Sequence, residues 1–146
     1  MGKLVIENEV LVTGIEKLIK EGRQISFTPK GSSMLPFIRG NKDTVQLNAP
    51  ENIQKGDIVL ARTAPSTYVL HRVIDITGST ILLMGDGNIK GIEKCRPEDI
   101  IAVATSIDKG GKVIDCRSKS HLRKAAIWKM LKPLRRYILA IYRRII

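Results

Sequence analysis

Two residues of this chain have types and positions that allow nucleophilic chemistry: a serine in a glycine-flanked turn and a histidine in an apolar run. Residues 26–36 read SFTPKGSSMLP, and His71 lies in the run Val69–Val73. A serine hydroxyl is a poor nucleophile near neutral pH and needs a neighbouring base. Of the two histidines, His71 has the better context than His121, because it falls in a predicted strand. The pair favours an acyl-transferring serine hydrolase.

Four short motifs surround this pair in the chain. They are Gly31-Ser32-Ser33-Met34-Leu35-Pro36, Lys55-Gly56-Asp57-Ile58-Val59, Leu70-His71-Arg72-Val73-Ile74 and Gly85-Asp86-Gly87-Asn88. As a set, the series resembles the signal peptidase and LexA-type serine peptidase superfamily, over roughly residues 28–115. The resemblance implies a serine endopeptidase in which Ser33 forms the acyl-enzyme. Its base is a lysine in most bacterial signal peptidases and a histidine in the archaeal and endoplasmic-reticulum type, so His71 makes the chain similar to the latter.

The resemblance also bears on the group that would orient His71. Asp86 corresponds to the aspartate of the family's Gly-Asp-x-Asn motif, which implies that it orients the base or stabilises its protonated form. A structural interpretation stays open, because Asp-Gly is also an ordinary tight-turn sequence. Relatives of the histidine type carry further aspartates after this motif, where this chain has Gly91-Ile92-Glu93. Glu93 is a weaker candidate for the same role. Activity is expected to fall as His71 becomes protonated.

The turn around Ser33 departs from the family at the group that stabilises the tetrahedral intermediate. Signal peptidases place a serine two residues before the nucleophile, and this chain has Gly31 there. Ser32 is then a candidate donor, or a small residue required by the turn. A missing donor costs about 10²-fold or more in rate, so turnover is expected to be slow. Met34 and Pro36 are expected to shape the turn and to wall the substrate cleft.

The elements that must position these residues are a helix, a β body and a helical tail. Apolar residues at helical spacing predict a helix over residues 7–22, with Leu11, Ile15 and Leu18 on its apolar face. Short β-branched runs between turn residues predict strands at 44–47, 57–61, 68–76, 81–84, 100–107 and 112–115. We therefore expect a mainly β fold, a coiled or barrel-like sheet of the LexA and signal peptidase type. The predicted organisation is one peptidase-like domain over residues 1–116, with its β body at 26–115, and a tail over 117–146.

The tail is basic and amphipathic. Ile127, Leu131, Leu134, Ile138, Ile141 and Ile145 form an apolar stripe at helical spacing, and Pro133 predicts a kink or a second helix. Three interpretations compete: packing on the β body or a partner, binding to a membrane surface through residues 120–146, and binding to nucleic acid. The aliphatic stripe argues against nucleic acid, because phosphate binding gains nothing from it.

Charge and composition limit the class of protein. The net charge of +11 lies almost entirely in residues 117–146, which hold ten Lys or Arg and no Asp or Glu. No long apolar stretch predicts a signal peptide or a membrane span, so we expect a cytoplasmic protein, peripheral at the inner face of the membrane. Cys95 and Cys116 are expected to be reduced, structural thiols. No metal-ligand cluster or phosphate loop indicates a cofactor or a metal.

Two other functions remain open beside the peptidase acting on a peptide or protein substrate. A non-catalytic scaffold that docks to a membrane or a partner is suggested by Gly31 and by the missing second aspartate. A LexA-like self-cleaving regulator would carry a DNA-binding segment before the β body and an Ala-Gly or Cys-Gly bond to cut. About 25 residues precede the β body and neither bond occurs, so this function is the least favoured. Substrate and oligomeric state are not indicated.

Overall fold

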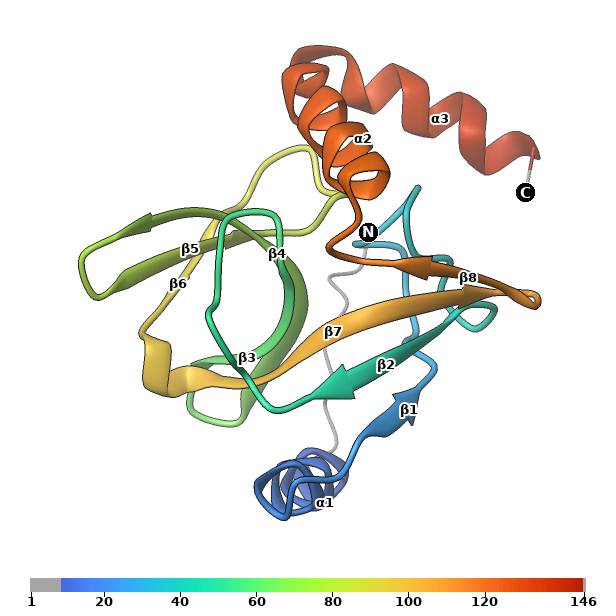
Figure 1. The fold of residues 1–146 in the computed structure, drawn as a ribbon. Coiled ribbons are helices and arrows are strands. Elements are labelled where there is room, and N and C mark those ends of the chain that lie inside the picture. Colours follow the sequence, from blue (N-terminus) through green and yellow to red (C-terminus); the bar gives the residue numbers. More distant parts are fainter. Residues whose placement is uncertain (1–8, 146) are drawn as a thin grey trace.

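An eight-stranded antiparallel sheet forms the centre of the computed structural model, which describes residues 9–145 (Figure 1). In chain order the elements are α1 (Glu9–Lys20), β1 (Ile25–Phe27), β2 (Thr44–Asn48), β3 (Ile58–Ala64), β4 (Thr67–Thr77), β5 (Thr80–Met84), β6 (Glu93–Cys95), the 3₁₀ turn η1 (Pro97–Asp99), β7 (Ile100–Lys109), β8 (Lys112–Asp115), α2 (Lys119–Met130), the 3₁₀ turn η2 (Lys132–Leu134) and α3 (Arg135–Ile145). The strand order is β1-β2-β7-β3-β4-β5-β6, with β8 beside β7.

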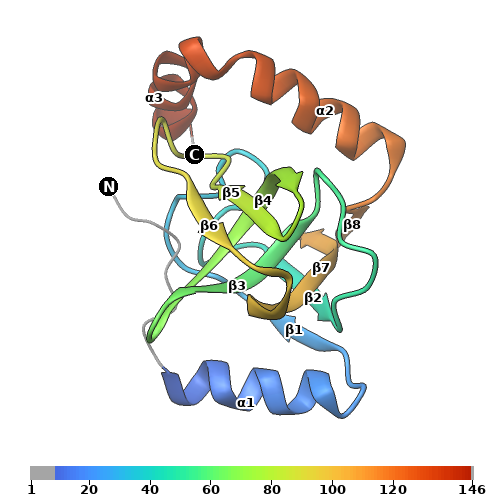
Figure 2. The same ribbon diagram turned by 90° about the vertical axis from the view of Figure 1, so that its left-hand side faces the viewer.

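The six strands predicted from β-branched runs are confirmed, each within three residues at either end. The sheet curls on itself (Figures 1 and 2), which confirms the expectation of a mainly β, coiled body. Two further strands, β1 and β6, were not predicted. Each has only three residues, which is too short for an alternating pattern to be visible in the sequence.

Helix α1 covers one side of the sheet (Figure 2) and buries Val12, Ile15 and Ile19 in the main core. These residues recur at intervals of three and four, so they lie on one helical face. The predicted face was right at Ile15 and wrong at both ends, because Leu11 is exposed and Leu18 is only half-buried. Residues 7 and 8 of the predicted helix lie outside the described residues.

The tail forms two helices that break at Pro133, as predicted, with that proline in the first turn of η2. Figure 2 shows α2 and α3 on the side of the sheet opposite α1. Trp128 and Leu139 are buried against Leu35 of the β body. Packing on the body is therefore confirmed for this face of the tail. Within residues 9–145, none of the helices combines the length and the apolar character needed to cross a membrane.

Candidate active site

Ser33 lies in the irregular segment between β1 and β2. Gly31, two residues earlier, has a φ of 92°, a backbone conformation that glycine adopts without steric cost. Met34 is fully buried in the main core and anchors the segment next to Ser33. The expectation that Met34 walls a substrate cleft is therefore corrected: its side chain packs inside the protein, because an apolar thioether gains more from the core than from water.

His71 lies on β4 and contacts two groups with its two ring nitrogens. Nε2 is 3.3 Å from Oγ of Ser33, and Nδ1 is 2.6 Å from Oε1 of Glu93. A carboxylate accepts hydrogen bonds only, so Nδ1 carries the proton in the neutral ring and Nε2 keeps its lone pair toward the serine hydroxyl. This is the tautomer that a general base needs to take a proton from Ser33.

Ser33, His71 and Glu93 are shielded from water. The side chains of Ser33 and His71 have no exposed surface, and the side chain of Glu93 is 9% exposed. Charge interactions are stronger in such a site than in water, because the surroundings screen them less. A carboxylate 2.6 Å from Nδ1 in such a site is placed to hold the ring of His71 in one orientation.

The turn formed by Gly85, Asp86 and Gly87 holds the segment around Ser33 in place. The N–H of Gly87 donates a hydrogen bond to the carbonyl oxygen of Ser33 at 2.7 Å. A Cβ on Gly85 would lie 2.4 Å from that same oxygen, and a Cβ on Gly87 would lie 2.3 Å from the carbonyl oxygen of Ser32. Both distances are too short for any side chain. The two glycines of the Gly-Asp-Gly sequence therefore allow this turn to approach the backbone of Ser32 and Ser33 closely, in addition to turning the chain.

Asp86 does not contact His71. Its carboxylate accepts hydrogen bonds from Arg72, at 2.8 Å from Nε and 2.7 Å from Nη2. Neighbouring residues of a strand point to opposite faces of the sheet, so Arg72 and His71 contact different partners. The expectation that Asp86 orients the base is corrected: Asp86 pairs with Arg72, and Glu93 occupies the position at His71.

Arg72 joins the turn to helix α2. Burial alone would lower its pKa, but the charge of Asp86 and the hydrogen bonds to it outweigh that effect and raise the pKa. Its Nη1 also lies 2.8 Å from the carbonyl oxygen of Gly56 and 3.2 Å from Nε2 of His121. Burial, and then the charge of Arg72, lower the pKa of His121 to about 4. The ring of His121 is thus neutral at neutral pH and accepts from Arg72.

We expect His121 to make the protein less stable in mild acid. An unfolded imidazole has a pKa of about 6.5, so between about 6.5 and 4 the unfolded chain binds the proton and the folded chain does not. The stability is complete above this window and is lost as pH falls through it, by at most about 1.4 kcal/mol per pH unit. Urea unfolding at several pH values measures the slope. His121→Asn keeps an acceptor without a proton equilibrium, and a slope that is unchanged in this variant would contradict the assignment.

The tail is tied to the same turn. Nε1 of Trp128 donates to the carbonyl oxygen of Asp86 at 2.6 Å, and Nη1 of Arg135 donates to that of Asn88 at 2.9 Å. Arg135 also lies over the ring of Trp128, at 5.3 Å from its centroid. Helices α2 and α3 therefore brace the turn that holds the Ser33 segment.

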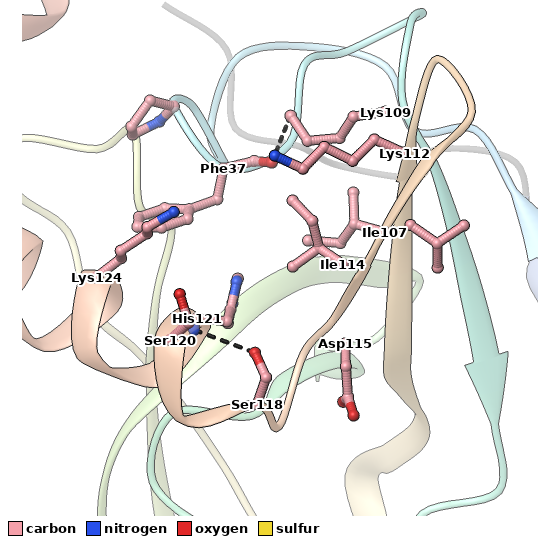
Figure 3. Close-up of a pocket in the computed structure, with 12 residues that line it drawn as sticks. Phe37, Ile107, Lys109, Lys112, Ile114, Asp115, Ser118, Ser120, His121 and Lys124 are labelled. Atoms are coloured by element: carbon pink, nitrogen blue, oxygen red, sulfur yellow. Dashed lines mark hydrogen bonds between the residues drawn. The ribbon is translucent and has the colours of Figure 1, made fainter.

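Two pockets border the segment around Ser33 without reaching the Ser33 hydroxyl. The first, of about 340 Å³, is lined by Pro36, Phe37 and His121 among others (Figure 3), and lies between the segment, β8 and α2. The second, of about 390 Å³, is lined by Gly31, Ser32 and Leu35, by the basic residues Arg39, Lys42 and Arg143, and by Gly40. The expected cleft residues Ser32 and Pro36 thus lie on different pockets.

The remaining candidates from the sequence take no part in this group. Cys95 and Cys116 are free and buried, and burial raises their pKa values to about 11 and about 12. Among the described residues, no three His, Cys, Asp or Glu side chains form a group that could hold a metal ion.

Comparisons of the chain with protein-family models, with curated proteins and with solved structures found no match.

Proposed function

We propose that this chain is a serine endopeptidase in which Ser33 is the nucleophile, His71 the general base and Glu93 the carboxylate that orients the base. The observation that carries the proposal is that His71 bridges Ser33 and Glu93, with one ring nitrogen toward each. A buried neutral imidazole needs a partner for each ring nitrogen, and at His71 these partners are a hydroxyl and a carboxylate. In hydrolytic triads on unrelated folds, the nucleophile hydrogen-bonds to the base and the base hydrogen-bonds to an orienting group. These three residues follow the same order.

In the proposed reaction, Oγ of Ser33 attacks the carbonyl carbon of the substrate peptide bond while Nε2 of His71 takes the hydroxyl proton. Glu93 stabilises the imidazolium that results. The imidazolium then gives this proton to the amine as the C–N bond breaks, which leaves an acyl ester on Ser33. Water attacks the ester with His71 again as base, and releases the acid and the free serine. Because Gly31 has no hydroxyl, the negative oxygen of the intermediate relies on backbone N–H groups or on Ser32.

A substrate reaches Ser33 only after a neighbouring segment moves, because the side chain is fully buried in the described conformation. The pocket beside Gly31 and Ser32 reaches the backbone of the nucleophile segment from outside. A peptide bound there would have to approach Oγ past this segment or past the turn at Gly85. Gated sites of this kind commonly close around their substrates.

The second candidate function is a non-catalytic scaffold, and the complete burial of Ser33 is the observation that favours it. The contact between His71 and Glu93 argues against it. A scaffold gains little from a buried carboxylate beside a histidine, since both groups lose water on burial. The two functions differ in one measurable property, which is whether Ser33 reacts.

A serine-directed probe tests the proposal. The folded protein is incubated with a fluorophosphonate, which forms a P–O bond to a nucleophilic serine and releases fluoride. We expect one adduct, mapped by mass spectrometry to Ser33, and none in protein unfolded by urea. Signal peptidase-like serines resist common inhibitors, so cleavage of a peptide library with small residues before the cut is measured in parallel. An adduct on Ser32 alone, or neither labelling nor cleavage, would overturn the proposal in favour of the scaffold.

A further inference from the structure

The C-terminal helices leave an apolar surface uncovered. Six of the ten exposed large apolar side chains of the described residues lie within α2, η2 and α3. We call these six the docking face: Ile127, Met130, Leu134, Tyr137, Ile141 and Ile145. Ile127 and Met130 lie on α2. On η2 and α3 the other four follow one another at intervals of three and four residues, which is the spacing of one face of a helix. Exposed apolar side chains gathered in this way mark an interaction site more often than isolated ones do.

The docking face is not needed to hold the helices on the protein. A different set of side chains packs inward: Ala125, Trp128 and Leu139 are buried. Arg135 adds its hydrogen bond to Asn88. The apolar stripe predicted from the sequence is thus divided. Leu131 and Ile138 pack against the buried cluster of Leu35, Trp128 and Leu139, while the other four residues of the stripe are exposed. The helices can therefore bind a partner through the docking face while their inner face stays on the body.

The charge around the docking face is positive. Residues 117–146 hold ten Lys or Arg and no acidic residue. Arg117 pairs with Asp57 and Arg135 is buried, but Lys132, Arg136 and Arg144 are exposed on the same turns and helix as the apolar residues. A basic surface beside an aliphatic stripe is the composition of helices that lie in a membrane interface.

We propose that the docking face binds the surface of an anionic lipid bilayer. The apolar side chains would enter the boundary between headgroups and acyl chains, and the cations would lie among the anionic headgroups. Nucleic acid would engage the cations and leave the aliphatic side chains in water. A second copy of the chain would bring two clusters of like charge together. An anionic bilayer matches both properties of the surface. This proposal does not depend on the peptidase activity.

Flotation of the full chain with lipid vesicles tests the proposal. We expect the protein to float with vesicles of phosphatidylcholine mixed with phosphatidylglycerol, to float less as salt is raised, and to remain unbound with phosphatidylcholine alone. Ile141→Asp should lower the partition coefficient by at least about tenfold, because it removes an inserted side chain and adds a repelled charge. Val113→Asp is the matched control, since Val113 on β8 has the same 63% exposure as Ile141.

The charge contribution has its own pair of variants. Arg136→Gln with Arg144→Gln should weaken flotation by about tenfold, whereas Lys17→Gln with Lys20→Gln on α1 changes the net charge equally and should not. Equal losses in both pairs would overturn the proposal, since binding would then follow total charge. Absence of flotation would also overturn it, and so would a dimer that Ile141→Asp dissociates without any flotation.

Trp128 reports which side of the helices meets the lipid, because it is the single tryptophan and lies on the inner face. We expect brominated lipids to leave its fluorescence unquenched in the bound protein. Strong quenching would show that the inner face enters the bilayer, which would overturn docking through the docking face.

Discussion

Replacing Ser33 by alanine is expected to lower kcat for peptide cleavage by about 10⁴- to 10⁶-fold. The variant loses the only atom that the proposed mechanism bonds to the substrate, and the remaining groups can at most bind the peptide and polarise its carbonyl. The measurement is cleavage of the best library peptide under saturating substrate. Thermal unfolding of the same sample shows whether the fold is kept.

Ser32→Ala is the matched control, because Ser32 is the neighbouring serine in the same segment and lines the adjacent pocket. Its loss should cost less than about 10³-fold, even where its hydroxyl donates to the tetrahedral intermediate. Equal activity of Ser33→Ala and the unaltered protein would remove Ser33 as nucleophile. A larger loss in Ser32→Ala than in Ser33→Ala would transfer that role to Ser32.

The sequence was sufficient to pair Ser33 with His71, for a physical reason. Both residues stand out from their surroundings: a serine in a turn beside glycine, and a histidine in a mainly apolar run that is buried on both faces. A buried polar side chain needs a partner. The two nitrogen contacts of His71 satisfy this requirement.

Glu93 was only the weaker candidate in the sequence, and its contact with His71 could not be predicted because its position depends on strand register. It belongs to β6, a strand of three residues that pairs with β5 so that Glu93 is opposite Leu83. A shift of one residue would turn the carboxylate to the other face of the sheet. Nothing in the sequence Glu-Lys-Cys fixes that register, because the pairing is set by the folded sheet.

Asp86 was assigned wrongly, although the chain contains the information to place it. Arg72 is a cation in the middle of an apolar strand, so it must be buried with a carboxylate if it is buried at all. It points away from His71, since neighbouring residues of a strand alternate. The aspartate that follows β5 is in reach of that opposite face, and the structure places the pair there at 2.7 Å.

The tail illustrates a different limit of sequence patterns. Helical spacing showed that an apolar stripe exists, but a stripe can face the body or the surroundings. Trp128 decides between these in the structure through its hydrogen bond to Asp86, a contact with no counterpart in helical periodicity. The helices therefore pack through one face and expose another.

The second large effect is expected at Glu93, and it separates this residue from Asp86. Glu93→Gln should lower kcat by about 10⁴-fold, as an amide in place of the orienting carboxylate does in other triads. The amide can hold His71 in the wrong tautomer and cannot stabilise the imidazolium. Its thermal unfolding should change little, because the amide is similar in shape to the carboxylate and keeps an oxygen that can accept from Nδ1 of His71.

Asp86→Asn is the matched carboxylate-to-amide control, with the opposite pattern of effects. It leaves the buried cation of Arg72 without its counter-charge, which should lower the free energy of unfolding by about 3–5 kcal/mol. Under conditions where the variant is folded, kcat should fall by less than about tenfold. A large loss of kcat in Asp86→Asn together with normal turnover in Glu93→Gln would reverse the assignment.

A double variant shows whether Glu93 acts through the nucleophile and its base. Groups that work as one unit give losses that do not add, because the second replacement removes a contribution that the first has already abolished. Adding Glu93→Gln to Ser33→Ala should therefore leave the residual rate of Ser33→Ala unchanged. A further loss of about 10⁴-fold in the double variant would mean that Glu93 contributes independently of Ser33. The contacts that connect Glu93 to His71 and His71 to Ser33 would then not explain how Glu93 contributes to catalysis.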